Sequence, residues 1–317
     1  MTNNIPSTEE RVWAVLSHLS AIAFGMGILL PVIGWSEQRR KSNYASFQCL
    51  QALGYQSLGY TVWLLTYLVL MLVFVGSMVV TLGSAREGAS HMNDMNVFMG
   101  IWISIFLFII FGALGVYFLL PVIAAIACAL GKDFRYPVMG KRLAVYLGYD
   151  PARAGDEQIW LDDDHAERWV AAMGHFSVII ALWGMLAPLT AWILQGKRSL
   201  FLKFQSVQTL VYQAGVMLLF LGAGFIYMIG FAVLGAVVGF NAKANPDSVN
   251  VVALAISIIP MLIAFAIILI VPLFHILGQW AGYRMLKGDD YRYPLVGRLV
   301  EKWLHSQSGS QTSIEHH

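Results

Sequence analysis

Four stretches of this chain run for more than thirty residues with almost no charged side chain, at about 44–82, 97–130, 204–240 and 251–285. About 20 apolar residues are enough for a helix to cross a bilayer. Of all 317 residues, 58% are hydrophobic and 12% are charged, whereas soluble domains have roughly 45–50% and about 25%. The sequence therefore predicts an all-α integral membrane protein.

Two shorter features limit the class of protein further. The first 13 residues hold no basic region and no small-residue cleavage site, so we expect no removable signal peptide. Cys49 and Cys128 lie in or beside apolar stretches, and we expect small buried side chains there, not a disulfide framework.

The sequence also repeats itself at an offset of 157 residues. Residues 10–20 match 167–177 at five of eleven positions, and two further pairs of windows keep the same offset, as do the pairs Pro31 with Pro188 and Trp35 with Trp192. The other windows are 44–56 with 201–213, at six of thirteen, and 131–147 with 288–304, at seven of seventeen. Because the offset is constant, the pattern indicates a tandem duplication, a common way to build membrane folds.

The duplication predicts a division of the chain into five parts. They are an N-terminal tail (1–9), a first membrane repeat (10–149), an acidic linker (150–166), a second membrane repeat (167–304) and a disordered tail (305–317).

Each repeat opens with a shorter apolar segment, residues 13–35 and 169–194. Such a segment can cross the bilayer once, or it can dip in and return as a helical hairpin. In the second case we expect the break at glycines, namely Gly25 and Gly27 in the first repeat and Gly184 in the second.

Basic residues distinguish the two topologies, because cytoplasmic loops carry an excess of Lys and Arg. With single crossings the repeats are inverted and the 20 basic residues divide 10 to 10; with returning segments only Arg86 and Lys243 lie outside. The pattern favours two parallel repeats, each a re-entrant helical hairpin plus two long transmembrane helices. It places the protein in a bacterial inner (cytoplasmic) membrane with both termini cytoplasmic. Trp13 and Trp35, which resemble the anchors of one span, keep the single crossing open.

Two nearly identical polar turns, GKDFRYP and GDDYRYP, follow long apolar stretches. Their glycines, Gly131 and Gly288, fit left-handed helix C-caps. We expect the arginines to meet lipid phosphates, the tyrosines to lie at headgroup depth, and the prolines to end the helix. The residues of this predicted interface motif are Arg135, Tyr136, Pro137, Arg292, Tyr293 and Pro294. A binding motif is the alternative, and it would need a partner that touches both copies.

Two histidines, His18 and His175, occupy equivalent places inside apolar segments. A polar group in hydrocarbon is costly and therefore a candidate for function. Each imidazole could satisfy a carbonyl of the broken helix, ligate a pigment, haem or metal, or belong to a polar path between the repeats.

Glutamines follow the same repeat and form a polar stripe on one helical face. They are Gln48, Gln51 and Gln56 in the first repeat, and Gln205, Gln208 and Gln213 in the second. Hydrogen bonds between helices explain such a stripe. The alternative is a hydrophilic groove across which the glutamines and histidines of the two repeats face each other.

No catalytic motif stands out. The sequence shows no nucleophile–base pair, Gly-rich phosphate loop or metal-spaced cluster, and we interpret residues 162–164, three aspartates, as a solvated linker. We therefore expect neither an enzyme nor a cofactor, metal or nucleic-acid site. The expected partners are the lipid bilayer and other membrane-protein subunits.

The motif order resembles an uncharacterised bacterial membrane-protein family that is distantly similar to the twenty-kilodalton subunit of the chloroplast inner-envelope import apparatus. The order is ERxxAxLSHLS, a proline-containing apolar segment, a basic loop, an FQxxQ helix and a closing RYP turn, and it covers about 10–147 and 167–304. The resemblance marks His18, Gln48, Gln51, Arg135, Tyr136 and Pro137 and their equivalents. The second repeat departs from it at Gly174, where the first has Ser17.

These observations support one main functional hypothesis, a non-enzymatic accessory or scaffolding subunit of a larger membrane complex. The alternative is a translocation or transport element with a polar groove between the repeats, which the chloroplast resemblance suggests only by analogy.

Overall fold

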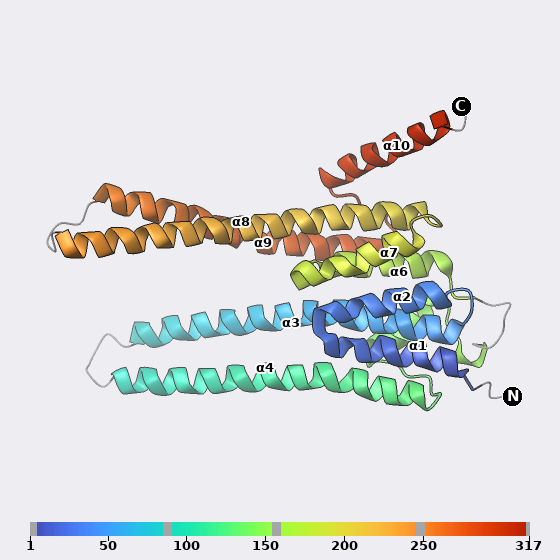
Figure 1. The fold of residues 1–317 in the computed structure, drawn as a ribbon. Helices are drawn as coiled ribbons and strands as arrows, with labels where there is room; N and C mark the ends of the chain where they lie inside the picture. The colour runs from blue at the N-terminus through green and yellow to red at the C-terminus, as the bar shows by residue number, and fades with distance from the viewer. Residues whose placement is uncertain (1–4, 85–90, 154–159, 245–250, 315–317) are drawn as a thin grey trace.

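The computed structural model describes residues 5–84, 91–153, 160–244 and 251–314, and within these ranges every regular element is helical. The first repeat comprises α1 (Thr8–Leu19), η1 (Ser20–Ile28), α2 (Leu29–Gln38), α3 (Asn43–Ser84), α4 (His91–Ala129) and α5 (Met139–Leu147). After η3 (Pro151–Arg153), the second comprises α6 (Asp163–Phe176), η4 (Ser177–Met185), α7 (Leu186–Gln195), α8 (Leu200–Ala244), α9 (Val251–Leu286) and α10 (Val296–Ile314) (Figure 1). The predicted all-α membrane fold with two tandem repeats is confirmed.

The opening segment of each repeat reverses direction and forms a helical hairpin. In the first repeat, Gln38 at the end of α2 donates a hydrogen bond of 3.0 Å to Glu9 at the start of α1, and Gly34 lies against Trp13. In the second repeat, Pro188 of α7 lies against Gly174 of α6. The two arms of each hairpin are therefore antiparallel, as Figure 1 shows for α1 and α2.

The reversal does not occur at a glycine, so that detail of the prediction is wrong. The residues with positive φ are Phe24 (φ 54°, ψ −138°) and Ala181 (φ 49°, ψ −130°), which are equivalent in the two repeats. The glycines serve a different purpose, since a Cβ on Gly27 or Gly184 would overlap a backbone carbonyl of the opposite arm. They are required for the close approach of the arms.

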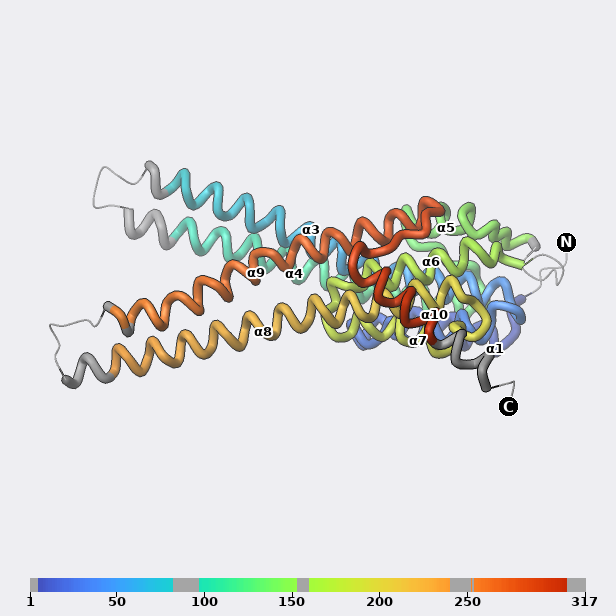
Figure 2. The backbone as a smooth tube through the Cα atoms, turned by 90° about the horizontal axis from the view of Figure 1, so that it is seen from above, coloured from blue at the N-terminus to red at the C-terminus, as the bar shows by residue number. Residues whose placement is uncertain are grey.

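Among the described residues, six segments are long and apolar enough to cross a membrane, and two of these, Thr8–Gln38 and Asp163–Gln195, are the folded hairpins. Measured from Thr8 to Phe24 and from Phe24 to Gln38, the two arms are only about 24 Å and 21 Å long at about 1.5 Å per residue, less than the roughly 30 Å hydrocarbon core. The other four are the long helices α3, α4, α8 and α9, which project in one direction from the hairpins, while both termini lie at the opposite end (Figure 2).

Several predicted boundaries can be placed on this fold. Asp162 caps the N-terminus of α6 by accepting a bond from the His165 amide, so this helix begins inside the predicted linker. Helix α10 continues to Ile314, into the predicted tail. Residues 85–90, which include Arg86, and residues 154–159, 245–250 and 315–317 lie outside the described ranges.

The two hairpins pack against each other and form the centre of the molecule. The buried core includes Trp35 and Leu50 from the first repeat and Met173 from the second. The indole of Trp169 in α6 donates to the Leu50 carbonyl in α3 at 2.9 Å. One buried core therefore joins the two repeats beside the long helices.

Candidate functional site

The repeated polar turns begin where α4 and α9 end. Gly131 (φ 73°) and Gly288 (φ 92°) adopt the left-handed conformation. The amides that follow bond back to carbonyls of the last turn, Lys132 to Ala127 at 2.9 Å and Asp289 to Arg284 at 3.1 Å. This pattern is the Schellman motif, which satisfies carbonyls that a helix end would leave free. The predicted C-caps are confirmed.

In the first repeat, the predicted histidine, two glutamines and the turn tyrosine meet in one buried group, called here the first cluster: His18, Gln48, Gln51 and Tyr136. The His18 Nδ1 atom lies 3.0 Å from the Tyr136 hydroxyl, and its Nε2 atom lies 3.0 Å from Gln48 Oε1. Since His18 belongs to α1, the glutamines to α3 and Tyr136 to the turn, the cluster ties together three elements that are far apart in sequence.

The surroundings of Gln48 determine the tautomer of His18. The amide nitrogen of Gln48 donates to Asp133 Oδ1 at 3.0 Å and to the Phe134 carbonyl at 3.1 Å, so its Oε1 atom faces the imidazole. An oxygen acceptor requires a proton on His18 Nε2. The Nδ1 atom of a neutral ring is then an acceptor, and the Tyr136 hydroxyl donates to it.

Gln51 holds the polar turn against α3 through the backbone. Its Oε1 atom accepts from the Tyr136 amide at 2.9 Å, and its Nε2 atom donates to the Phe134 carbonyl at 3.0 Å and to Gln48 Oε1 at 3.1 Å. A primary amide offers one acceptor and two donors, and here all of these functions are used. The FQxxQ motif thus works as a clamp on the RYP turn.

The second repeat builds the same group, called here the second cluster: His175, Gln205, Gln208 and Tyr293. The His175 Nδ1 atom lies 3.1 Å from the Tyr293 hydroxyl and its Nε2 atom lies 3.3 Å from Gln205 Oε1. Gln208 accepts from the Tyr293 amide at 3.4 Å and donates to the Tyr291 carbonyl at 2.9 Å. The motifs repeat in the sequence because each copy forms its own cluster.

One residue distinguishes the second cluster from the first. The Thr209 hydroxyl lies 3.1 Å from His175 Nδ1 and also donates to the Gln205 carbonyl at 2.7 Å. Its equivalent in the first repeat is Ala52, which offers no polar group. The second imidazole therefore has an additional neighbour for hydrogen bonding.

The third glutamine of each repeat forms hydrogen bonds with the helical hairpin. Gln56 donates to the Ser17 carbonyl at 3.2 Å and the Ser20 hydroxyl at 3.0 Å, and Gln213 donates to the Gly174 carbonyl at 2.9 Å. The hypothesis that the histidines satisfy carbonyls of the broken helix is therefore wrong, because these glutamines do so.

The turn tyrosines are buried within the protein, and their depth in the bilayer remains a prediction. Tyr136 is 3% exposed and Tyr293 is 2% exposed. Each ring stacks on a tyrosine of the adjacent long helix, on Tyr55 at 4.1 Å and on Tyr212 at 3.9 Å between ring centroids. Burial raises the pKa of Tyr136 well above the usual value near 10, so its hydroxyl remains a donor.

The turn arginines pair with carboxylates of the same repeat. Arg135 Nε lies 3.1 Å from Asp133 Oδ2, and Arg292 lies 2.8 Å from Glu301. Pro137 and Pro294 follow the tyrosines at the point where the chain turns toward α5 and α10. Contact of the arginines with lipid phosphate remains a prediction.

The clusters do not face each other across an open groove. His18 and His175 are fully buried, and Gln48 and Gln205 are at most 1% exposed. All of their described partners belong to the same repeat. Because both ring nitrogens of each histidine are hydrogen-bonded, ligation of a pigment, haem or metal would first require one of these bonds to break.

Sequence reasoning missed the polar contacts between the repeats. Arg39, which follows α2, is 10% exposed and donates to Gln195 at 3.0 Å and to Glu167 at 2.9 Å. It also contacts Asp163, at the start of α6, at 3.3 Å. No repeat signal could reveal Arg39, since its equivalent position is Gly196.

The glutamate of the ER motif accepts a hydrogen bond from an equivalent serine in both repeats. Glu10 accepts from Ser42, and Glu167 accepts from Ser199 at 2.5 Å. Both serines also accept amide bonds at the start of the following long helix, as helix N-caps do. The equivalent serines, Ser42 and Ser199, were the sequence signal from which these hydrogen bonds could have been predicted.

Two further predictions concern metals and thiols. Among the described residues, no three His, Cys, Asp or Glu side chains gather as a metal site requires. Cys49 and Cys128 are buried free thiols, as expected.

Comparison with known families gives one result that covers most of the chain. Residues 9–143 and 166–300 each match the magnetosome magnetite crystal formation protein family. No curated protein and no solved structure matches the chain, and nothing links it to chloroplast import. With two matching copies that span most of its length, the chain belongs to the magnetosome magnetite crystal formation protein family, as a tandem duplication of the family's domain.

Proposed function

We propose that the protein is a non-catalytic accessory or scaffolding subunit of a larger complex in a bacterial membrane. The family description suggests that this membrane encloses a compartment in which a magnetite crystal forms. The protein would support that process by holding other membrane subunits in place, without itself performing a reaction.

One observation carries this proposal. In both repeats the polar residues with potential for chemistry are used to bind the hairpin, the long helix and the RYP turn to one another. A buried polar network in which every member is bonded makes a structure rigid and specific. Rigidity repeated in two copies suits a platform for partners better than it suits a reaction.

The proposed placement in the bilayer follows from length and charge. The hairpin arms are too short to cross and would be re-entrant, whereas α3, α4, α8 and α9 would span the bilayer. Both termini and the basic turns, such as residues 39–41 and 197–198, would lie at the cytoplasmic face of the inner membrane, in accordance with the positive-inside rule.

The test is gentle extraction of the full chain from its native membrane, followed by native-gel sizing and mass spectrometry of the co-migrating proteins. The proposal expects an assembly with reproducible membrane-protein partners. A stable monomer without partners in mild detergent would contradict it. An absorption spectrum of the same sample would reveal a pigment or haem, and thus a role for the histidines beyond structure.

A translocation or transport role is less well supported. It would require His18, His175, Gln48 and Gln205 to line a water-filled path, and their burial argues against such a path in this conformation. Cysteines placed at these positions and tested with water-soluble thiol reagents distinguish the two functions. Labelling would favour transport, and protection from both sides would favour the scaffold.

A further inference from the structure

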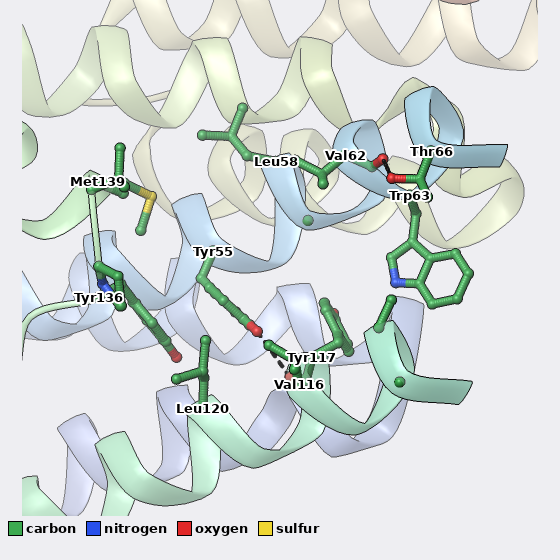
Figure 3. Close-up of a pocket in the computed structure, with 15 residues that line it drawn as sticks. Tyr55, Leu58, Val62, Trp63, Thr66, Val116, Tyr117, Leu120, Tyr136 and Met139 are labelled. Atoms are coloured by element: carbon green, nitrogen blue, oxygen red, sulfur yellow. Dashed lines mark hydrogen bonds between the residues drawn. The ribbon is translucent and has the colours of Figure 1, made fainter. Parts of the chain in front are cut away.

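The first repeat contains a cavity of about 550 Å³ between α3, α4 and the turn that precedes α5. Figure 3 shows Leu58 and Val62 from α3, Val116 and Leu120 from α4, and Tyr136 and Met139 at one end. Pockets of 300–1,000 Å³ are typical of small-molecule sites. Val62 and Val116 on the rim are 63% and 56% exposed, so the cavity opens sideways to the surroundings of the long helices.

Aromatic pairs hold the two helices apart on both sides of this cavity. Tyr55 stacks on Tyr117 at 5.5 Å at the end near the turn, and Tyr67 contacts Phe106 at 6.5 Å farther along the helices. Between these pairs Gly112 has no atom near the place where a side chain would project. The gap is therefore built by large side chains on either side of a small one.

The long helices of the second repeat lie closer together than those of the first. Gly224 stands where the first repeat has Tyr67, and Gly230 of α8 lies directly against Met261 of α9. Small residues allow membrane helices to approach closely. Close contact of the long helices at Gly230 and Met261 therefore distinguishes the second repeat from the first.

The cavity is apolar along the helices and has polar groups near the turn. The Tyr117 side chain lines the cavity and is 5% exposed, and its hydroxyl lies near that of Tyr60. Lys141 and Arg142, which follow Met139 in α5, are exposed and form no ion pair within the described chain. An amphiphile with an acyl chain and a negative head would complement both ends.

The turn at the mouth of the cavity is strained in this repeat alone. The Met139 amide bonds to the Pro137 carbonyl at 2.7 Å across Val138, which has φ 64° and ψ −54°. This is a classical γ-turn, which is rare and strained, and the strain is greatest for a β-branched residue. Leu295, the equivalent residue, has no positive φ. Strain of this kind concentrates at ligand clamps and functional sites.

We propose that this cavity binds one anionic phospholipid, with an acyl chain between α3 and α4 and the head-group phosphate at Lys141 and Arg142. The lipid enters sideways from the bilayer and fills the gap that the aromatic pairs maintain. It would make the first repeat the lipid-binding half of the duplicated protein. The inference does not depend on the proposed scaffolding function.

The test uses native mass spectrometry of the full-length protein, delipidated and then supplied with phosphatidylglycerol or phosphatidylcholine of identical acyl chains. One phosphatidylglycerol should be retained at energies that strip other lipids. Gly112→Phe places a ring in the cavity and should reduce this retention at least fivefold. Gly115→Phe is the matched control, because Gly115 is an equally open glycine of α4 that does not line the cavity.

The head-group contact is tested separately. Lys141→Gln with Arg142→Gln should remove the preference for phosphatidylglycerol over phosphatidylcholine, whereas Arg298→Gln with Lys302→Gln on α10 should leave it intact. Equal retention by Gly112→Phe and Gly115→Phe would overturn the cavity site. Equal retention of the two lipids by the unmodified protein would overturn the anionic specificity. Thermal stability of each variant in detergent confirms that it is folded.

Discussion

The two repeats share the same base and differ in their long helices. At the base, each hairpin, FQxxQ helix and RYP turn are joined by equivalent hydrogen bonds. Beyond it, α3 and α4 are separated by a cavity, whereas α8 and α9 are in direct contact at Gly230 and Met261 and cross in Figure 1. The buried polar network therefore defines the domain, while residues along the helices determine how the repeat meets its surroundings.

Different residues at the helix contacts explain this divergence. Helix α9 contains Pro260 and Pro272, and α4 contains only Pro121 among its described residues. Proline bends a helix, so we expect bends at different heights in the two repeats. These differences, and the exchange of Tyr67 for Gly224, accompany the closer approach of α8 and α9.

The largest effect is expected when the clamp on the RYP turn is removed. Gln51→Leu would leave the buried Tyr136 amide without a partner and delete two donor bonds, at a cost of about 2–3 kcal/mol. Gln208→Leu should cost about 1 kcal/mol less, because its bond to the Tyr293 amide is already long at 3.4 Å. Thermal unfolding of the detergent-solubilised protein measures both losses. Ser104→Ala, an exposed change on α4, is the control. Equal losses would mean that the two clamps are energetically the same.

The next effect concerns the closed helix pair. Gly230→Leu would force a side chain into Met261 and should destabilise the protein by about 1–3 kcal/mol, as overpacking does. Val73→Leu at the equivalent position of the first repeat should change stability by less than about 0.5 kcal/mol, because Val73 is 50% exposed. Unfolding temperatures in the same detergent compare the two. A large loss at Val73 would show that α3 and α4 are closed in solution.

A smaller effect tests the difference between the histidine environments. Tyr136→Phe would leave the buried His18 Nδ1 atom without a donor and should cost about 1–2 kcal/mol. Tyr293→Phe should cost less, because the Thr209 hydroxyl lies 3.1 Å from His175 Nδ1 and can turn to donate.

A double variant sharpens this comparison. Thr209→Ala removes the substitute donor, so the cost of Tyr293→Phe in that background should rise to the cost of Tyr136→Phe. A double-mutant cycle from unfolding measurements gives the coupling directly. Additive effects of Thr209→Ala and Tyr293→Phe would exclude the proposed substitution of one donor by the other.

The sequence predicted the architecture well because its signals are long and repeated. Long apolar stretches and the glycine caps at Gly131 and Gly288 are local patterns. The constant offset appears when the chain is compared with itself, so all of these signals can be read from the sequence alone. The histidines, glutamines and tyrosines of the two clusters could also be recognised in the sequence, because they recur at the same offset. Their partners could not be predicted, since the contact between His18 and Tyr136 joins residues 118 positions apart. Such pairing depends on how the hairpin packs, which no local pattern specifies. Ala181, where the second hairpin reverses, gave no signal because alanine normally avoids positive φ.

The smallest predicted effect concerns this reversal at Ala181, and it is a gain in stability, whereas the other substitutions cause losses. Ala181 has φ 49° and ψ −130°, a region that costs a non-glycine residue about 1–3 kcal/mol. Ala181→Gly relieves this strain and loses part of the gain to chain entropy, so the protein should become about 1 kcal/mol more stable. At the equivalent Phe24 the ring contacts Tyr60 at 5.2 Å and Tyr117 at 6.3 Å between centroids. Phe24→Gly should therefore be a net loss, because the packing removed outweighs the strain relieved. Thermal unfolding measures the change in stability for both substitutions. A change in the same direction for both would contradict the idea that ring contacts at Phe24 outweigh the backbone strain.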